Sequence, residues 1–176
     1  MKLVRVASVM FFMLCMFVTA TNAQSVQTDF DRSFDFSKLR TFNFVVQQRT
    51  ANDPLAQDPL NEGRIRAALE SKLVANGFRH EGKKADFVVA YYVTTRKALN
   101  VQDYGYGPPR WFGRRDIRVD QYTEGTLTVD LIDASTHQLV WRGRASGTVE
   151  LKEMDKRVNK AVEKLVAKFL KDTRKK

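Results

Sequence analysis

The sequence predicts an α+β domain of two layers, with a largely antiparallel sheet of about five strands covered on one face by two helices. Several short segments alternate apolar and polar residues, which is typical of half-buried strands. Two longer segments instead repeat apolar residues every three or four positions, as amphipathic helices do. Along the chain these segments predict two strands, a helix, three strands and a final helix.

Residues 1–23 are predicted to be an export signal that precedes the fold. Lys2 and Arg5 come before an apolar run over residues 6–18, and Ala23 ends a stretch of small side chains that a signal peptidase recognises. The apolar run is shorter than the roughly 20 residues that a bilayer core requires. We therefore expect cleavage after Ala23 rather than an uncleaved membrane anchor.

Cys15 is the only cysteine of the sequence and lies within this predicted signal. Met13 and Leu14 before it are not the small residues that precede a lipid-modified cysteine, so no lipid attachment is expected there. Cleavage would leave residues 24–176 as a single domain without a disulfide or a thiolate. A chain of that length can bury a core of its own.

The first half of this domain predicts two strands, a loop and a helix. Residues 26–30 and 42–46 alternate in the manner of strands, and the polar stretch 47–57 is predicted to be a loop. Asp58-Pro59 is an N-cap followed by proline at the first helical position, and Gly77 is a left-handed C-cap. The predicted apolar face of this helix contains Ile65, Ala68, Leu69 and Leu73.

The second half predicts a central strand and a hairpin. Residues 87–93 are apolar on both faces, as in a strand that lies inside a sheet. Two alternating segments, 122–131 and 139–151, flank a turn at 133–137 and predict an antiparallel hairpin. The small residues Gly143, Ala145 and Gly147 predict a place where a helix approaches the sheet closely.

The sequence also predicts the exposure or the backbone conformation of three residues of this hairpin. Asp130 is expected to face solvent, because its neighbours Val129 and Leu131 point the other way. Asp133 is expected to initiate the turn, and His137 to adopt a left-handed conformation within it.

Residues 154–176 predict an amphipathic helix of strong positive charge. The segment has nine Lys or Arg and three Asp or Glu, a net +6 within the +10 of the whole sequence. Such a helix presents either a solvated face or a peripheral, salt-sensitive contact with an anionic membrane surface. Its apolar face contains Val158, Ala161, Val162, Leu165 and Phe169, and its lysine stripe contains Lys156, Lys160, Lys164 and Lys168.

Residues 100–118 are predicted to form an irregular loop, because glycine and proline are dense there. Aromatic and basic side chains alternate along it, and exposed aromatic side chains either fold back onto the sheet or contact a partner. The candidate interaction residues of this loop are Tyr104, Tyr106, Arg110, Trp111, Phe112, Arg114 and Arg115.

Several blocks of the sequence resemble the domain-of-unknown-function 4136 family. The hairpin segments Gln121–Leu127 and Leu139–Gly147 carry the resemblance, together with Asp35-Phe36-Ser37 and Asn76-Gly77-Phe78, and it extends over nearly all of residues 24–176. The resemblance implies a bacterial envelope protein, often lipid-anchored, with no assigned activity. This chain departs from the family by lacking the lipid-attachment context at its cysteine, and by having His137 where a turn glycine is common.

We find no catalytic or metal-binding pattern in the sequence. The only histidines, His80 and His137, both lie in predicted loops, and neither a Gly-x-Ser-x-Gly elbow nor a phosphate-binding glycine motif is present. Glu124, Asp130 and Asp133 could supply the carboxylate pair of a hydrolase. No cofactor and no metal are therefore predicted.

The sequence thus favours a non-catalytic exported envelope protein that binds or scaffolds a partner in the periplasm or at a membrane surface. The aromatic basic loop and the lysine stripe are the predicted contact regions, and an anionic membrane surface or an envelope protein is the predicted partner. The alternative is a hydrolase with an unrecognised carboxylate site. Nucleic-acid binding could use the same charge and aromatic side chains, but export separates the chain from nucleic acid.

Overall fold

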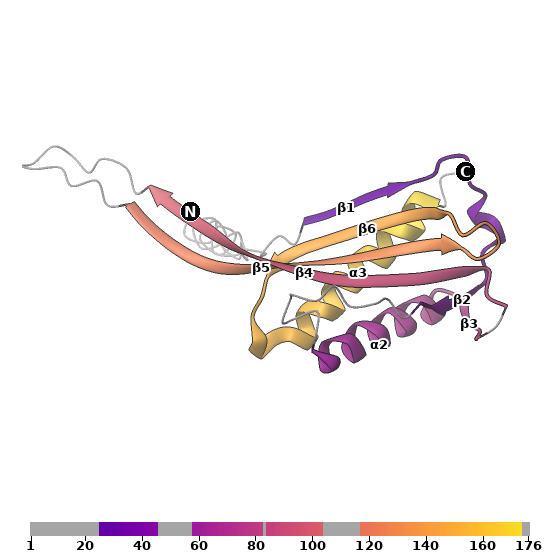
Figure 1. The fold of residues 1–176 in the computed structure, drawn as a ribbon, viewed down its shortest axis with the longest axis horizontal. Coiled ribbons are helices and arrows are strands. Elements are labelled where there is room, and N and C mark those ends of the chain that lie inside the picture. Colours follow the sequence, from indigo (N-terminus) through magenta and orange to yellow (C-terminus); the bar gives the residue numbers. More distant parts are fainter. Residues whose placement is uncertain (1–24, 46–57, 83, 104–116, 174–176) are drawn as a thin grey trace, which may run out of the picture.

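The computed structural model describes residues 25–45, 58–82, 84–103 and 117–173. They form one mixed sheet of six strands in the order β1-β6-β5-β4-β2-β3, with two helices on one of its faces (Figure 1). The predicted signal at 1–23 lies outside the described residues. In chain order the elements are β1 (Ser25–Phe30), η1 (Phe36–Lys38), β2 (Thr41–Phe44), α2 (Pro59–Ala75), β3 (Arg79–His80), β4 (Phe87–Asp103), β5 (Ile117–Asp133), β6 (Leu139–Thr148), η2 (Leu151–Glu153) and α3 (Met154–Thr173).

Three antiparallel pairings, β1 with β6, β6 with β5 and β5 with β4, build the larger part of the sheet. The predicted β5–β6 hairpin is confirmed. Its turn is held by Asp133, whose carboxylate accepts hydrogen bonds from the Thr136 hydroxyl at 2.6 Å, the Ser135 hydroxyl at 2.7 Å and the Thr136 amide at 2.9 Å. These bonds, that of the Thr136 hydroxyl above all, lower the pKa of Asp133. His137 has a φ of 58°, the left-handed conformation predicted for it.

In the other part of the sheet, β2 pairs in parallel with β4. The two strands run in the same direction because α2 follows β2 in the chain and carries it back to the end of the sheet from which β2 starts. The predicted ends of this helix are confirmed. The Asp58 side chain accepts a hydrogen bond from the Leu60 amide at 2.9 Å, and Pro59 occupies the first helical position. Gly77 has a φ of 94°, and the Phe78 amide donates to the Leu73 carbonyl at 3.1 Å.

The sheet is mixed and has six strands, so the prediction of about five largely antiparallel strands was only roughly right. The additional strand is β3, two residues long and parallel to β2. It forms because the Arg79 amide donates to the Arg40 carbonyl at 2.9 Å and the Glu81 amide to the Phe42 carbonyl at 2.8 Å. A strand of two residues is too short to produce an alternating pattern in the sequence.

The prediction of an irregular loop over residues 100–118 was wrong at both ends. β4 continues to Asp103 and β5 begins at Ile117, in one register that runs from Phe87↔Asp133 to Asp103↔Ile117. Pairing with the other strand satisfies the backbone groups on the facing side of each strand, and the ladder is continuous through these residues. The glycines and prolines that suggested a loop lie at 105–109, outside the described residues.

The core lies between the sheet and the two helices and is rich in aromatic side chains. Trp141 and Phe87 are fully buried, and the Trp141 ring lies 5.5 Å from the ring of Phe169 on α3. Gly143 lies beneath Trp141, and a Cβ atom added there would be 2.7 Å from Leu165 Cδ2. The close approach of a helix to this small residue, predicted from the sequence, is therefore confirmed.

Candidate functional site

The outer halves of β4 and β5 form a two-stranded ribbon that projects from one end of the domain (Figure 1). β6 pairs with β5 only as far as Glu124↔Thr148, and β2 pairs with β4 only at residues 87–89. The ribbon, defined here as residues 97–103 and 117–123, contains seven cross-strand pairs and no third strand among the described residues. At about 3.4 Å per residue it extends roughly 20 Å.

One face of the ribbon carries exposed apolar side chains. Leu99 lies opposite Gln121, and Val119 comes two residues before Gln121 on β5, so strand alternation places Leu99 and Val119 on the same face. Leu99 is 60% exposed and Val119 is 53% exposed. These two side chains do not contribute to the core, and large exposed apolar groups are typical of contact surfaces.

An ion pair holds the two strands together where the ribbon leaves the domain. Arg96 and Glu124 are directly opposite each other, and the Arg96 Nε and Nη2 atoms lie 2.7 and 2.6 Å from Glu124 Oε2. The Arg96 side chain is largely exposed, so the pair contributes at most about 1 kcal/mol to stability. It marks the boundary between the domain and the ribbon.

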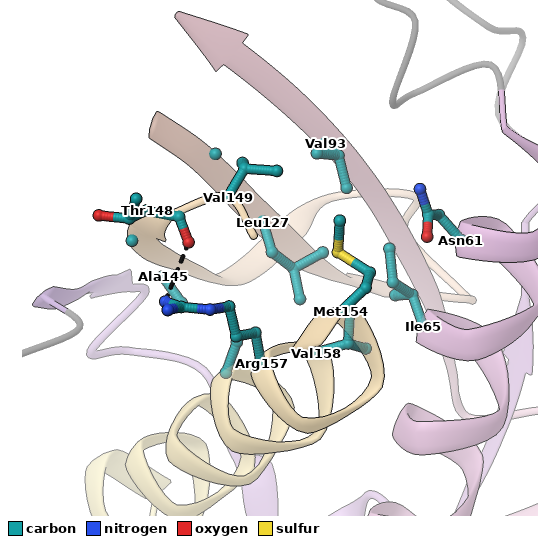
Figure 2. Close-up of a pocket in the computed structure, with 13 residues that line it drawn as sticks. Asn61, Ile65, Val93, Leu127, Ala145, Thr148, Val149, Met154, Arg157 and Val158 are labelled. Carbon is teal, nitrogen blue, oxygen red and sulfur yellow. Dashed lines mark hydrogen bonds between the residues drawn. The ribbon is translucent and has the colours of Figure 1, made fainter. Parts of the chain in front are cut away.

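An apolar pocket of about 80 Å³ lies at the base of the ribbon, on the helix side of the sheet (Figure 2). Gly125 of β5 and Gly147 of β6 are paired directly opposite each other. The Val149 side chain packs over Gly125, where an added Cβ would lie 2.8 Å from Val149 Cγ2. Figure 2 shows Leu127, Ile65 and Val158 directed toward this space from β5, α2 and α3. The remaining lining residues are Asn61, Val93, Ala145, Thr148, Val149, Met154, Arg157 and Ala161.

The size of the pocket restricts what it can hold. A cavity of about 150 Å³ accommodates a benzene-sized molecule, and pockets for drug-sized ligands are several times larger. A space of 80 Å³ with an apolar lining therefore suits one aliphatic side chain.

Polar contacts hold the walls of the pocket in place. Arg157 Nη1 donates to the Thr148 carbonyl at 3.0 Å, a bond drawn in Figure 2, and Arg157 also pairs with Glu150. Arg64 Nε lies 2.6 Å from Asp155 Oδ1, which joins the second turn of α2 to the first turn of α3. These groups fix the β6–α3 connection and the start of both helices, so the apolar lining is the part available for contact.

The candidate interaction residues predicted from the sequence divide into two groups. Tyr104, Tyr106 and the other five residues of the aromatic basic loop lie outside the described residues. The four lysines of the stripe lie on α3, where Lys156 and Lys160 are exposed but Lys164 and Lys168 are half-buried. At 3.6 residues per turn each step of four residues advances about 40° around the helix, so the stripe winds toward the buried face.

The prediction that Asp130 faces solvent was wrong. Asp130 lies on the sheet face away from the helices, yet only 5% of it is exposed, because Arg142 of β6 covers it. The two side chains form a bidentate pair, with Arg142 Nε 2.7 Å from Asp130 Oδ1 and Nη2 2.6 Å from Oδ2. The hydrogen bonds to Asp130 are the main cause of a raised pKa at Arg142.

The three carboxylates of the hydrolase alternative do not form a pair. Glu124 and Asp130 share one face of β5, but they are six residues and therefore about 20 Å apart. Glycosidase carboxylates lie within about 10 Å of each other. Asp133 is on the other face and is engaged by its turn.

The two histidines lie apart from these carboxylates and from each other. His80 belongs to β3, where its ring stacks on Phe42 at 5.3 Å and its Nδ1 lies 3.0 Å from Glu70 Oε1, whereas His137 is in the β5–β6 turn. Within the described residues no three His, Cys, Asp or Glu side chains come close enough to hold a metal ion.

Sequence reasoning missed the pocket and the apolar face of the ribbon. The pocket draws its lining from α2, three strands and α3, and such a combination depends on the packing of distant segments. One local signal was available, since Gly125 and Gly147 interrupt two strongly alternating strands and the hairpin register sets them opposite each other. Glycine has no side chain to pack on the surface of a sheet, and in a strand it often marks a place where other groups approach closely.

The chain matches a protein-family model described as "Domain of unknown function (DUF4136)" over residues 26–169. The match extends from β1 into the last turns of α3 and includes the ribbon and all residues that line the pocket. No curated protein is significantly similar to the chain in sequence.

Three of the solved structures that are similar to the chain share 12–14% of their sequence with it. A PDZ domain protein from Parabacteroides distasonis superimposes with a TM-score of 0.56 at 13% identity, over 82% of this chain and 35% of that one, so this chain spans about a third of its length. The PelC dodecamer from Paraburkholderia phytofirmans gives 0.49 at 14% identity, over 82% and 96%. A minor lipoprotein from Acinetobacter baumannii gives 0.38 at 12% identity, over 76% and 91%. At these identities the first similarity concerns the fold alone, and the scores of the other two are too low to support an inference.

Proposed function

This chain belongs to the DUF4136 family, and from that premise we propose that it is a non-catalytic exported envelope protein that holds a partner. The ribbon is the part of the molecule that makes the contact. Residues 1–23 serve as a signal that is removed after Ala23, and residues 24–176 act as one domain in the periplasm or at the surface of an envelope membrane.

The single observation that supports binding is the ribbon with its apolar face. An isolated two-stranded ribbon is marginally stable in water, and Leu99 and Val119 would gain from being covered. Nothing in the described part of the domain covers them, whereas a partner that packs on this face would remove both side chains from water. The ribbon is therefore better suited to contact than to support of the core.

The charge and the helices of the chain agree with a peripheral location. In the described part of the chain, neither helix combines the length and the apolar character that a membrane crossing requires. Lys156 and Lys160 are exposed on α3 and attract anionic surfaces at low ionic strength. We expect this attraction to bring the protein near a membrane without inserting it.

Photo-crosslinking in living bacteria tests the proposed contact. A photoreactive amino acid placed at Leu99, and in a second variant at Val119, is expected to give a covalent adduct of higher mass, because both side chains face the partner. Val74 on α2 is the matched control, since it is 51% exposed but lies outside the ribbon. The adducts are measured by immunoblot of the envelope fraction.

This experiment tests the contact surface and the removal of the signal separately. Adducts at positions 99 and 119 but not at 74, on a chain that begins at Gln24, are the expected result. Equal adducts at all three positions, or none at 99 and 119, would show that the ribbon is not the contact surface. Recovery of the chain with residues 1–23 still attached would contradict the proposed removal of the signal.

A further inference from the structure

We propose that the free edge of β1 binds an extended, acidic segment of another protein, which joins the sheet as a seventh, antiparallel strand beside the lysines of α3. This edge is separated from the ribbon by β6, and a contact of a few residues on one strand is weak and exchanges readily. It is a second, transient contact beside the lasting one that the ribbon provides. The backbone of β1, the position of the lysines and their charge support it.

β1 is an outer strand of the sheet and has one edge without a described neighbour (Figure 1). The Asp31 amide donates to the Val140 carbonyl at 3.0 Å, and the backbone groups of a strand point alternately to its two sides. Those of Val26, Thr28 and Phe30 therefore point away from β6. β1 pairs with β6 without a register shift and has neither proline nor lysine, which are common protections of an edge strand. Such an edge can accept a further strand.

The two flanks of α3 face different parts of the domain. On one flank, Asp155 and Glu163 form ion pairs with Arg64 and Lys72 of α2, at 2.6 and 3.2 Å. On the other flank, Arg157 donates to the carbonyl of the last residue of β6 at 3.0 Å. α3 also contacts β1, the strand beside β6. The flank that contains Arg157 is therefore the one directed toward β1, and it is called the β1 flank here.

The β1 flank carries an excess of positive charge. Lys160, Lys164 and Lys168 belong to it, because they follow Arg157 by three, seven and eleven residues. Lys160 is exposed and Lys168 is half-buried, and neither forms an ion pair with a described residue. Asp29, the only acidic residue of β1, faces away from the helices. A negatively charged partner is therefore favoured between this flank and the edge of β1.

The spacing of these lysines suits a strand on that edge. Thr28 pairs with Gly143, against which Leu165 packs, so Lys160 and Lys168 lie on either side of the middle of β1. Lysines four residues apart repeat about every 6 Å along a helix, and alternate residues repeat about every 7 Å along a strand. Acidic side chains at alternate positions of the added strand would thus lie on the helix side and meet about one lysine per turn.

The charges distinguish this pairing from two others. A second copy paired antiparallel through β1 would place both α3 helices on one face of a continuous sheet, with their lysines directed toward each other. The other long open edge is that of β4 beyond Val89. There Glu62 and Arg66 of α2 both interact with Tyr91, so that edge has no single sign of charge. An acidic segment at β1 is the pairing that the charges favour.

Binding of designed peptides tests this inference. The probe is a short fluorescent peptide in which glutamate alternates with threonine, and fluorescence anisotropy follows its binding to the chain purified from bacteria that express the full-length sequence. One control peptide has lysine in place of glutamate. A second has N-methylated glutamates, which keep the charge but lose the amide donors, because in an antiparallel pair the residues that face the helices also bond to β1. We expect the probe to bind about tenfold more tightly than either control.

Variants of the chain test the charge and the backbone separately. Lys160→Gln with Lys168→Gln removes two charges of the β1 flank, and its matched control is Lys84→Gln with Lys97→Gln, two exposed lysines outside α3 and β1. Thr28→Pro removes an amide that points outward, at an edge position where proline is tolerated, whereas Thr28→Ala keeps it. We expect binding to weaken about three- to tenfold for the first pair and about tenfold for Thr28→Pro, and to be unchanged in both controls.

The outcomes separate strand addition from attraction by charge alone. Circular dichroism and thermal unfolding check each variant, and the N-methylated peptide provides the same test if Thr28→Pro unfolds. Equal binding of the N-methylated peptide, undiminished binding to the variant with Lys160→Gln and Lys168→Gln, or no binding of the probe at low ionic strength would overturn the inference. The adducts at Leu99 and Val119 do not involve β1, so the proposed function stands or falls independently of this result.

Discussion

Replacing Gly143 by alanine is expected to lower the free energy of unfolding by about 2–3 kcal/mol, the range for overpacking a close-packed core. An added Cβ would lie 2.2 Å from Trp141 Cη2 and 2.7 Å from Leu165 Cδ2. The Trp141 ring cannot move aside, because it is 2% exposed and packs against Phe169 of α3. Urea unfolding followed by circular dichroism measures the change.

Two comparisons make this prediction specific. Gly63→Ala is the matched control, because a Cβ at this exposed position of α2 meets nothing within 4 Å, and a helix gains up to about 1 kcal/mol from the exchange. In a Trp141→Phe background, Gly143→Ala should cost less, since the outer ring atoms of the indole are absent. Equal effects at positions 63 and 143 would show that the close approach at Gly143 does not exist.

Replacing Arg142 by leucine is expected to lower the free energy of unfolding by about 3 kcal/mol, because it leaves the Asp130 carboxylate buried without its counter-charge. Asp130 is covered on the sheet face by the guanidinium, and both carboxylate oxygens depend on it. Chemical unfolding of the purified chain at neutral pH measures this change as well.

A double-mutant cycle identifies the cause of that loss. The variant with both Asp130→Leu and Arg142→Leu removes both charges together, so it should lose clearly less than the sum of the two single substitutions. Additive effects, or a loss below about 1 kcal/mol for Arg142→Leu alone, would mean that solvent screens the pair as it does an ordinary surface ion pair.

Much of the domain follows from local sequence signals. The Asp58 cap, the left-handed Gly77 and the Asp133 turn are each decided by a few neighbouring residues, and the structure confirms all three. The apolar face of α3 was predictable for the same reason, since Val162, Leu165 and Phe169 recur at the helical period and are buried. Local chemistry of this kind needs no knowledge of distant segments.

The features that concern function depend on pairing across the sheet. Asp130 occupies an alternating polar position, and its burial arises only because β6 brings Arg142 beside it. Residues 100–103 contain no strong strand pattern, but pairing with residues 117–120 extends β4 through them. The pocket likewise requires the starts of α2 and α3 to be held together by Arg64 and Asp155. Sequence alone could not combine these segments.

The central claim is that the ribbon serves contact while the rest of the domain supports the fold, and shortening the ribbon tests it most directly. Because Arg96 and Glu124 are directly opposite each other, an Asn-Gly turn can join them in place of residues 97–123. The measurement is the sedimentation of this shortened chain, extracted from bacteria under native conditions, beside that of the parent chain. We expect the parent in a larger complex and the shortened chain as a folded monomer, since no residue of the core is removed. A shortened chain that remains in the complex, or that fails to fold, would contradict this division of roles.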